Sequence, residues 1–175
     1  IMNPFRGFRP FRVEEGHLFF GREKQSEELL HKLSNERFVA VIGASGSGKS
    51  SLINCGLIQS LQGGLISSLG LNWEVIKAKP GISPIKNLTQ AILDKDENYK
   101  SLKEDKKIIK ETIITSILES SSYGLVDALS NIIKEEDKPI FLFIDQFEEL
   151  FRYRREVTNT SSVNESFIYV NILLE

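Results

Sequence analysis

The eight residues from Gly43 to Ser50 constrain the fold of this chain more than any other feature. Their sequence, Gly-Ala-Ser-Gly-Ser-Gly-Lys-Ser, has the glycine, lysine and serine spacing of a P-loop, or Walker A, motif. The apolar run 38–42 precedes the loop and is typical of a strand buried in a parallel sheet. Apolar residues at helical spacing follow it, so the order is strand, glycine-rich loop, helix, which is the context that the motif requires.

Small residues in this loop let successive amide N–H groups point at a phosphate chain, at the positive end of the following helix. Lys49 is expected to reach the β- and γ-phosphates and counts among the catalytic residues, while the Ser50 hydroxyl would ligate Mg²⁺. Ser51 joins the binding set, with capping or packing as its alternative role. The other expected phosphate contacts come from Gly43, Ser45, Gly46, Ser47 and Gly48.

A second apolar run, Ile140 to Ile144, ends on Asp145, the position of a Walker B carboxylate that would face Mg²⁺ from a neighbouring strand. Glu148 and Glu149 follow, and one of them would act on the attacking water as a catalytic residue. We favour Glu148. Two alternatives stay open: the acidic pair complements a helix dipole only, or Gln146 positions the water.

Composition places the chain among soluble globular proteins. Of its 175 residues 41% are hydrophobic and 26% charged, and the net charge of −2 argues against a general nucleic-acid surface. Cys55 is the one cysteine, which fits a reducing, cytoplasmic location, and no apolar run is long enough to span a membrane. The sequence lacks the Asn/Thr-Lys-x-Asp motif of guanine recognition, so adenine is the expected base.

The fold class expected from these patterns is α/β, a three-layer P-loop NTPase fold with a mainly parallel sheet. An N-terminal aromatic arm over 1–22 would precede a P-loop domain over 23–175. Further expected elements are a helix over 23–33, a strand over 73–77, a helix beginning at Ser83-Pro84, helical stripes at Ile109, Ile113, Ile117 and at Leu125, Leu129, Ile132, Ile133, a helix over 147–151, and a helix or strand over 167–174.

Four segments together resemble the STAND class of signal-transducing P-loop ATPases, in particular the bacterial group fused to WD40 repeats. They are Asn3-Pro4-Phe5-Arg6-Gly7-Phe8, Phe19-Phe20-Gly21-Arg22-Glu23, the P-loop, and Asp145-Gln146-Phe147-Glu148-Glu149-Leu150-Phe151. The resemblance implies a regulatory switch that holds ATP, hydrolyses it slowly to ADP, and acts on downstream domains of the same chain. It also implies that Phe20, Gly21 and Arg22 line the adenine.

The resemblance further implies a partial domain, since the strand with a polar sensor residue and the region with an arginine, which such proteins have after the Asp145 strand, have no counterpart here. If 167–174 is a helix, the central sheet position is empty, so we expect weak nucleotide binding, negligible hydrolysis and self-association. Two alternatives are an AAA-type ATPase acting on nucleic acid and a nucleotide-binding scaffold without hydrolysis. Membrane and nucleic-acid partners are not expected.

Overall fold

The structure is a computed structural model that describes residue 7 and residues 9–63, 73–121, 123–134, 138–156 and 160–174. It divides into two compact units, residues 1–74 and residues 75–175. The candidate phosphate loop belongs to the first unit, and Asp145 belongs to the second. Each unit is described by itself below. The predicted segment Asn3 to Arg6, together with Phe8, lies outside the described residues.

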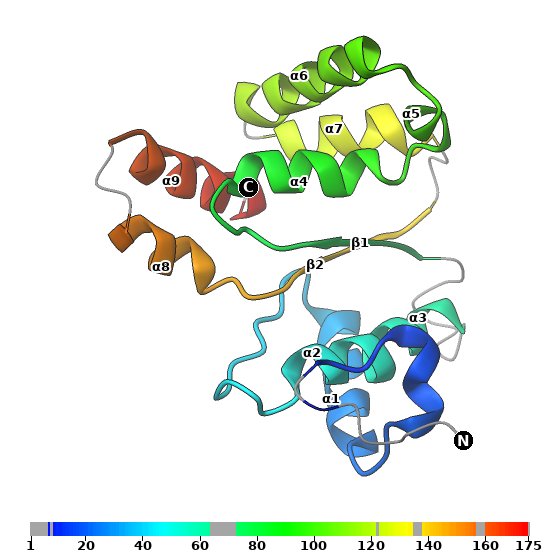
Figure 1. The fold of residues 1–175 in the computed structure, drawn as a ribbon. Helices are drawn as coiled ribbons and strands as arrows, with labels where there is room; N and C mark the ends of the chain where they lie inside the picture. Colours follow the sequence, from blue (N-terminus) through cyan, green and yellow to red (C-terminus); the bar gives the residue numbers. More distant parts are fainter. Residues whose placement is uncertain are drawn as a thin grey trace. The chain divides into compact units, whose positions relative to one another are not determined.

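The first unit is built from helices. A 3₁₀-helix, η1 (Val13–Leu18), precedes α1 (Glu23–Asn35), which confirms the helix predicted over 23–33. Beyond the loop, α2 (Lys49–Ser51), the π-helix η2 (Leu52–Ile58) and α3 (Gln59–Gln62) follow one another without a break (Figure 1). Both η1 and α1 pack on η2, so the helix that begins at the phosphate loop is the centre of this unit.

The close packing of α1 on η2 depends on a glycine. A methyl group at Gly56 would lie 2.1 Å from the Ser26 hydroxyl oxygen and 2.9 Å from Ser26 Cβ, so Ser26 would have to move to make room for it. Leu29 and Leu30 of α1 are buried, as are the apolar residues of η2. In a π-helix the backbone hydrogen bonds join residues five apart along the chain, and such stretches are frequent at functional sites.

The strand predicted over 38–42 is not present, so this prediction was wrong. The segment has no regular structure, and Phe38 and Ile42 are 65% and 92% exposed. A strand is stabilised by hydrogen bonds to a neighbouring strand, so an apolar run cannot form one alone. In the part of this unit that the structure describes, the regular elements are helices apart from Glu74, so the run has nothing there to pair with.

The second unit contains a small parallel sheet of β1 (Glu74–Ala78) and β2 (Ile140–Ile144), which confirms the strands predicted near 73–77 and at 140–144. Helices connect the two strands, as a parallel pair requires. They gather on one side of the sheet in Figure 1. The connecting helices are α4 (Pro84–Leu93), α5 (Glu97–Lys100), α6 (Glu104–Ser120) and α7 (Gly124–Ile132), and α8 (Glu149–Glu156) and α9 (Thr160–Leu174) follow β2.

The core of this unit lies between the helices and the sheet, and it corrects one predicted stripe. On α6 the fully buried residues are Ile114 and Leu118, whereas Ile109 and Ile113 are 59% and 50% exposed. Both sets have the same four-residue spacing, so periodicity could not decide between them. The packing of α6 on α4 and α7 made the choice. Ile117 is partly buried against the same core.

These elements form a mixed, mainly helical fold with a small parallel sheet, which is compatible with an α/β NTPase-like fold. The three-layer arrangement stays a prediction. Residues 167–174 belong to α9, which settles the open choice there in favour of a helix. Among the described residues, the structure has no helix with both the length and the apolar character needed to cross a bilayer.

Two buried tyrosines of this unit have different surroundings. The Tyr169 side chain is fully buried, and its hydroxyl has no hydrogen-bond partner among the described residues. Burial raises the pKa of this hydroxyl well above its ordinary value. The Tyr99 hydroxyl donates to the Glu111 carboxylate, and the Gln90 side-chain oxygen lies 3.4 Å from the same hydroxyl oxygen. A buried hydroxyl without a partner costs free energy, whereas one with partners stabilises the fold.

We therefore expect Tyr169→Phe to raise the free energy of unfolding by about 1 kcal/mol and Tyr99→Phe to lower it by about 1 kcal/mol. The aromatic ring is kept in both variants, so packing is little changed. Urea unfolding followed by far-UV circular dichroism measures both effects. Destabilisation by both substitutions to the same extent would contradict the assignment of Tyr169 as an unsatisfied group.

Candidate functional site

The glycine-rich loop in the first unit is curled by residues in left-handed backbone conformations. Gly46 and Gly48 have φ of 76° and 84°, a region in which side chains other than glycine are strained. Nothing lies within 4 Å of the position that a Cβ would occupy at either glycine, so the space beside the loop is open. The loop closes on α2 through the bond from the Leu52 N–H to the Gly48 carbonyl, 2.9 Å.

Lys49 folds back over this loop. Its Nζ donates to the Gly43 carbonyl at 2.7 Å and to the Ala44 carbonyl at 3.0 Å, which places the ammonium group over the start of the loop. Ser47 Oγ is 3.1 Å from where a Cβ would stand at Gly43, so the loop is tight at that point. A curled backbone, a lysine ammonium and a helix N-terminus together suit a phosphate chain, so these residues fit the expected ligand.

Ser51 lies next to Ser50 in the first turn of this helix, but its side chain contacts the N-terminal segment, defined here as residues 9–12. The Phe11 N–H donates to Ser51 Oγ at 3.1 Å, and Ser51 is buried. This contact fits the packing role that the sequence left open for Ser51. Its place among nucleotide-binding residues stays a prediction.

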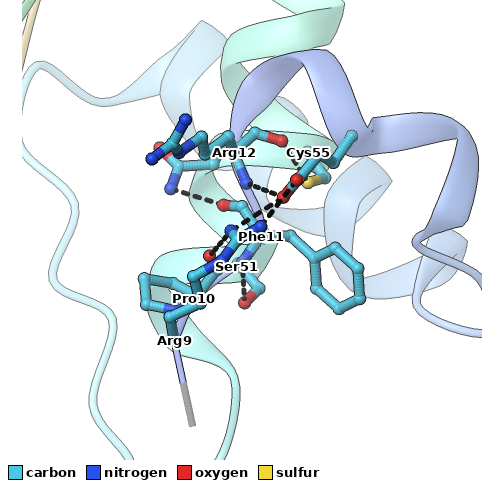
Figure 2. A network of polar contacts seen from close by, with 8 residues as sticks. Arg9, Pro10, Phe11, Arg12, Ser51 and Cys55 are labelled. Atoms are coloured by element: carbon cyan, nitrogen blue, oxygen red, sulfur yellow. Dashed lines mark hydrogen bonds and ion pairs between the residues drawn. The ribbon is translucent and has the colours of Figure 1, made fainter. Parts of the chain in front are cut away.

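The same helix holds the N-terminal segment at two further points (Figure 2). Asn54 Nδ2 donates to the Phe11 carbonyl at 2.9 Å, and Cys55 Sγ donates to the Arg12 carbonyl at 3.2 Å. Positions 51, 54 and 55 lie on one face of a helix, so three neighbouring side chains bind backbone groups of two consecutive residues, Phe11 and Arg12. Sequence analysis missed this contact because the partners are about forty residues apart and the segment's side chains take no part.

The segment predicted to line the base has one exposed and one partly buried side chain. Phe20 is 77% exposed, and Gly21, with φ of 84°, donates its N–H to Glu23 Oε1 at 2.9 Å. Arg22 stands at the start of α1 and lines a groove of about 630 Å³ in this unit. The groove runs along residues of α1 and the helical turns that follow Ser51, and its volume is in the range of small-molecule sites.

At the end of β2 in the second unit, Asp145 lies beside the residue that follows β1. The Asp145 N–H donates to the Ala78 carbonyl at 2.9 Å, which continues the pairing of the sheet by one residue. The Asp145 carboxylate is 3.2 Å from Lys79 Nζ, which also donates to Gln146 Oε1 at 3.2 Å. Lys79 was not singled out by sequence analysis, although it lies two residues after the strand expected over 73–77, and that position was a usable signal.

Gln146 and the two glutamates occupy distinct positions in the turn after Asp145. Gln146 has φ of 55°, which is uncommon for a residue other than glycine and turns the chain sharply after the strand. Glu149 Oε2 accepts a hydrogen bond from the Gly81 N–H at 3.1 Å, whereas Glu148 is exposed. The two glutamates, nearly equivalent in sequence, therefore differ in the structure: one holds a loop and the other faces solvent.

The structure thus brings together the loop residues 43–50 in one unit, and Asp145, Gln146 and Glu149 in the other. Within the described residues, no group of three or more His, Cys, Asp or Glu side chains is placed to hold a metal ion.

A curled glycine loop at a helix start and an aspartate at the end of a parallel strand are features that NTPase-type nucleotide-binding modules have. The chain belongs to the novel STAND NTPase 1 family, whose model matches residues 4–174. This membership supports the use of a nucleotide and a divalent metal ion. A search of curated proteins and a search of solved structures gave no match.

The contacts of the N-terminal segment generate a test. Ser51→Ala removes the acceptor for the Phe11 N–H, so the free energy of unfolding should fall by about 1 kcal/mol. Amide exchange at Phe11, followed by NMR, should become faster. Ser34→Ala, at an exposed position of α1, is the matched control and should change stability by less than about 0.5 kcal/mol. Unchanged exchange at Phe11 in Ser51→Ala would show that this contact does not hold the segment.

Proposed function

We propose that this chain is the Mg-ATP-binding regulatory module of a larger multidomain signalling protein, with slow hydrolysis of ATP to ADP in the complete protein. The observation that supports it most is the glycine loop, with Gly46 and Gly48 in left-handed conformations and the Lys49 ammonium over its start. Membership of an NTPase family supports the same reading.

In this proposal the loop amides bind the phosphates, and Lys49 exchanges its two carbonyl acceptors for phosphate oxygens. An ammonium group gains more from an anionic oxygen than from a neutral carbonyl, so this exchange is favourable. Ser50 and Asp145 are the proposed ligands of Mg²⁺. When bound, the ion would neutralise negative charge on the phosphates.

The proposed base is adenine, with Phe20, Gly21 and Arg22 on its side of the site. The exposed Phe20 ring offers a surface for stacking on a base, and Arg22 lines the groove beside α1. The proposed partners are downstream domains of the same chain, such as WD40 repeats, in the cytoplasm. By itself this chain is proposed to bind nucleotide weakly, to hydrolyse it negligibly and to self-associate.

Glu148 is the proposed residue that acts on the attacking water. Its neighbour Glu149 accepts a hydrogen bond from the Gly81 N–H, and that contact gives it a structural task in the turn. Glu148 is exposed, so its carboxylate is accessible to water and substrate. A carboxylate that acts as a general base needs such access.

Lys49→Ala tests the phosphate loop. The variant should lose detectable ATP binding, because the ammonium over the loop supplies charge that faces the phosphates. Isothermal titration calorimetry with Mg-ATP measures the affinity. Lys32→Ala, which removes an exposed lysine of α1 from the same unit, is the control and should bind as the parent does. Equal affinity in the parent and in Lys49→Ala would overturn the proposed function.

A second test compares Glu148→Gln with Glu149→Gln in a protein that includes the downstream domains. Loss of a general base should lower the hydrolysis rate of Glu148→Gln by about 10²- to 10⁴-fold, with little change in ATP affinity. Glu149→Gln should mainly lower the free energy of unfolding, by about 1 kcal/mol, because its bond to Gly81 is weakened. Phosphate release and urea unfolding are the measurements. A larger rate loss in Glu149→Gln would reverse the two roles, and no loss in either would favour a scaffold without hydrolysis.

A further inference from the structure

The Lys79 side chain contacts Asp145, a proposed metal ligand, directly. Lys79 Nζ lies 3.2 Å from Asp145 Oδ2, and the Asp145 side chain is 17% exposed, against 55% for Lys79. An ammonium group beside a largely buried carboxylate offsets its negative charge. The pair therefore sits at the point where the proposed function places a divalent cation.

The parallel sheet explains why this lysine meets this aspartate. The ends of neighbouring parallel strands lie at the same edge of the sheet, and the bond from the Asp145 N–H to the Ala78 carbonyl fixes the register there. Lys79 follows Ala78 directly, so its side chain starts beside Asp145. Backbone pairing of the two strands therefore places Lys79 and Asp145 side by side.

A second acceptor makes the hold on Lys79 more specific than an ordinary surface ion pair. Gln146 adopts a left-handed conformation, with φ of 55°, and its side-chain oxygen accepts from Lys79 Nζ at 3.2 Å. Such a conformation costs a residue other than glycine about 1 kcal/mol or more, so the surrounding structure must enforce it. The ammonium group is thus bound at two points by consecutive residues.

The loop that carries Lys79 is also fastened at its other end. The Gly81 N–H donates to Glu149 Oε2 at 3.1 Å, and the Pro80 carbonyl accepts from Asn87 Nδ2 of α4 at 2.8 Å. A methyl group at Gly81, where φ is 58°, would lie 2.7 Å from Asn87 Nδ2. Residues 79–81 therefore connect the turn after β2 to the first turns of α4. A displacement of Lys79 would act on the hydrogen bonds at both ends.

We propose, on the basis of the proposed function, that Lys79 is a positioning residue which competes with the divalent cation of the nucleotide for Asp145. An ammonium group and a metal ion on the same carboxylate repel each other, so binding of the metal weakens or breaks the contact with Lys79. Lys79 then sets how much Mg²⁺ the site needs, and the loop 79–81 transmits the exchange to α4.

The test uses the whole chain and three variants: Lys79→Met, which keeps length but removes charge, Lys79→Arg, which keeps charge, and Lys86→Met, an exposed lysine of α4, as the matched control. Binding of a fluorescent ATP analogue is measured while Mg²⁺ is titrated. In Lys79→Met the half-saturating Mg²⁺ concentration should fall about two- to fivefold, the range expected for loss of a partly exposed ion pair. Lys79→Arg and Lys86→Met should stay close to the parent.

An unchanged or raised half-saturating Mg²⁺ concentration in Lys79→Met would overturn the inference. A lower analogue affinity of Lys79→Met than of the parent, with both measured in EDTA, would also overturn it, because it would show that Lys79 contacts the nucleotide itself. Thermal unfolding checks that each variant is folded. Lys49→Ala, included in the same series, separates the two proposals. If Lys49→Ala binds the analogue as the parent does, the proposed function is wrong. If Lys49→Ala loses analogue binding but Lys79→Met shows an unchanged Mg²⁺ response, only the role of Lys79 is wrong.

Discussion

The parallel pairing of β1 with β2 is the interaction on which the second unit depends. A parallel pair needs a long crossover, and here the crossover supplies the helices α4, α6 and α7 that form the core with α9. The same pairing brings Asp145 beside Lys79, because the register is fixed by the backbone up to Ala78. In this unit the hydrogen bonds between two short strands therefore determine both the fold and the position of Asp145 beside Lys79.

The first unit depends on a different contact, between the N-terminal segment and the helix that follows the glycine loop. Side chains of Ser51, Asn54 and Cys55 bind backbone groups of the consecutive residues Phe11 and Arg12. Buried backbone groups need partners, and the helix provides them from one face. Since Ser51 directly follows Ser50, any movement of the loop on nucleotide binding would act on this segment as well.

Under the proposed function, each unit contributes residues to a nucleotide switch. One unit has the loop with Lys49, and the other has Asp145 with its neighbouring lysine and two glutamates in separate roles. A switch requires groups that exchange partners between states, because a ligand shifts an equilibrium only by its different affinity for the two states. Lys49, bonded to carbonyls, and Lys79, bonded to a carboxylate, are both groups that can make such an exchange.

The sequence by itself determined the local features of this protein: the glycine loop, the helix that begins at Lys49, the strand that Asp145 follows, and the family to which the patterns point. These follow from spacing and backbone preference, which act over a few residues. Tertiary structure decided the rest. The run 38–42 can form a strand only beside a partner strand. On α6, packing against neighbouring helices determined that Ile114 is buried and Ile113 is exposed. Lys79 and Asp145 are far apart along the chain, so only the pairing of the strands could bring them together.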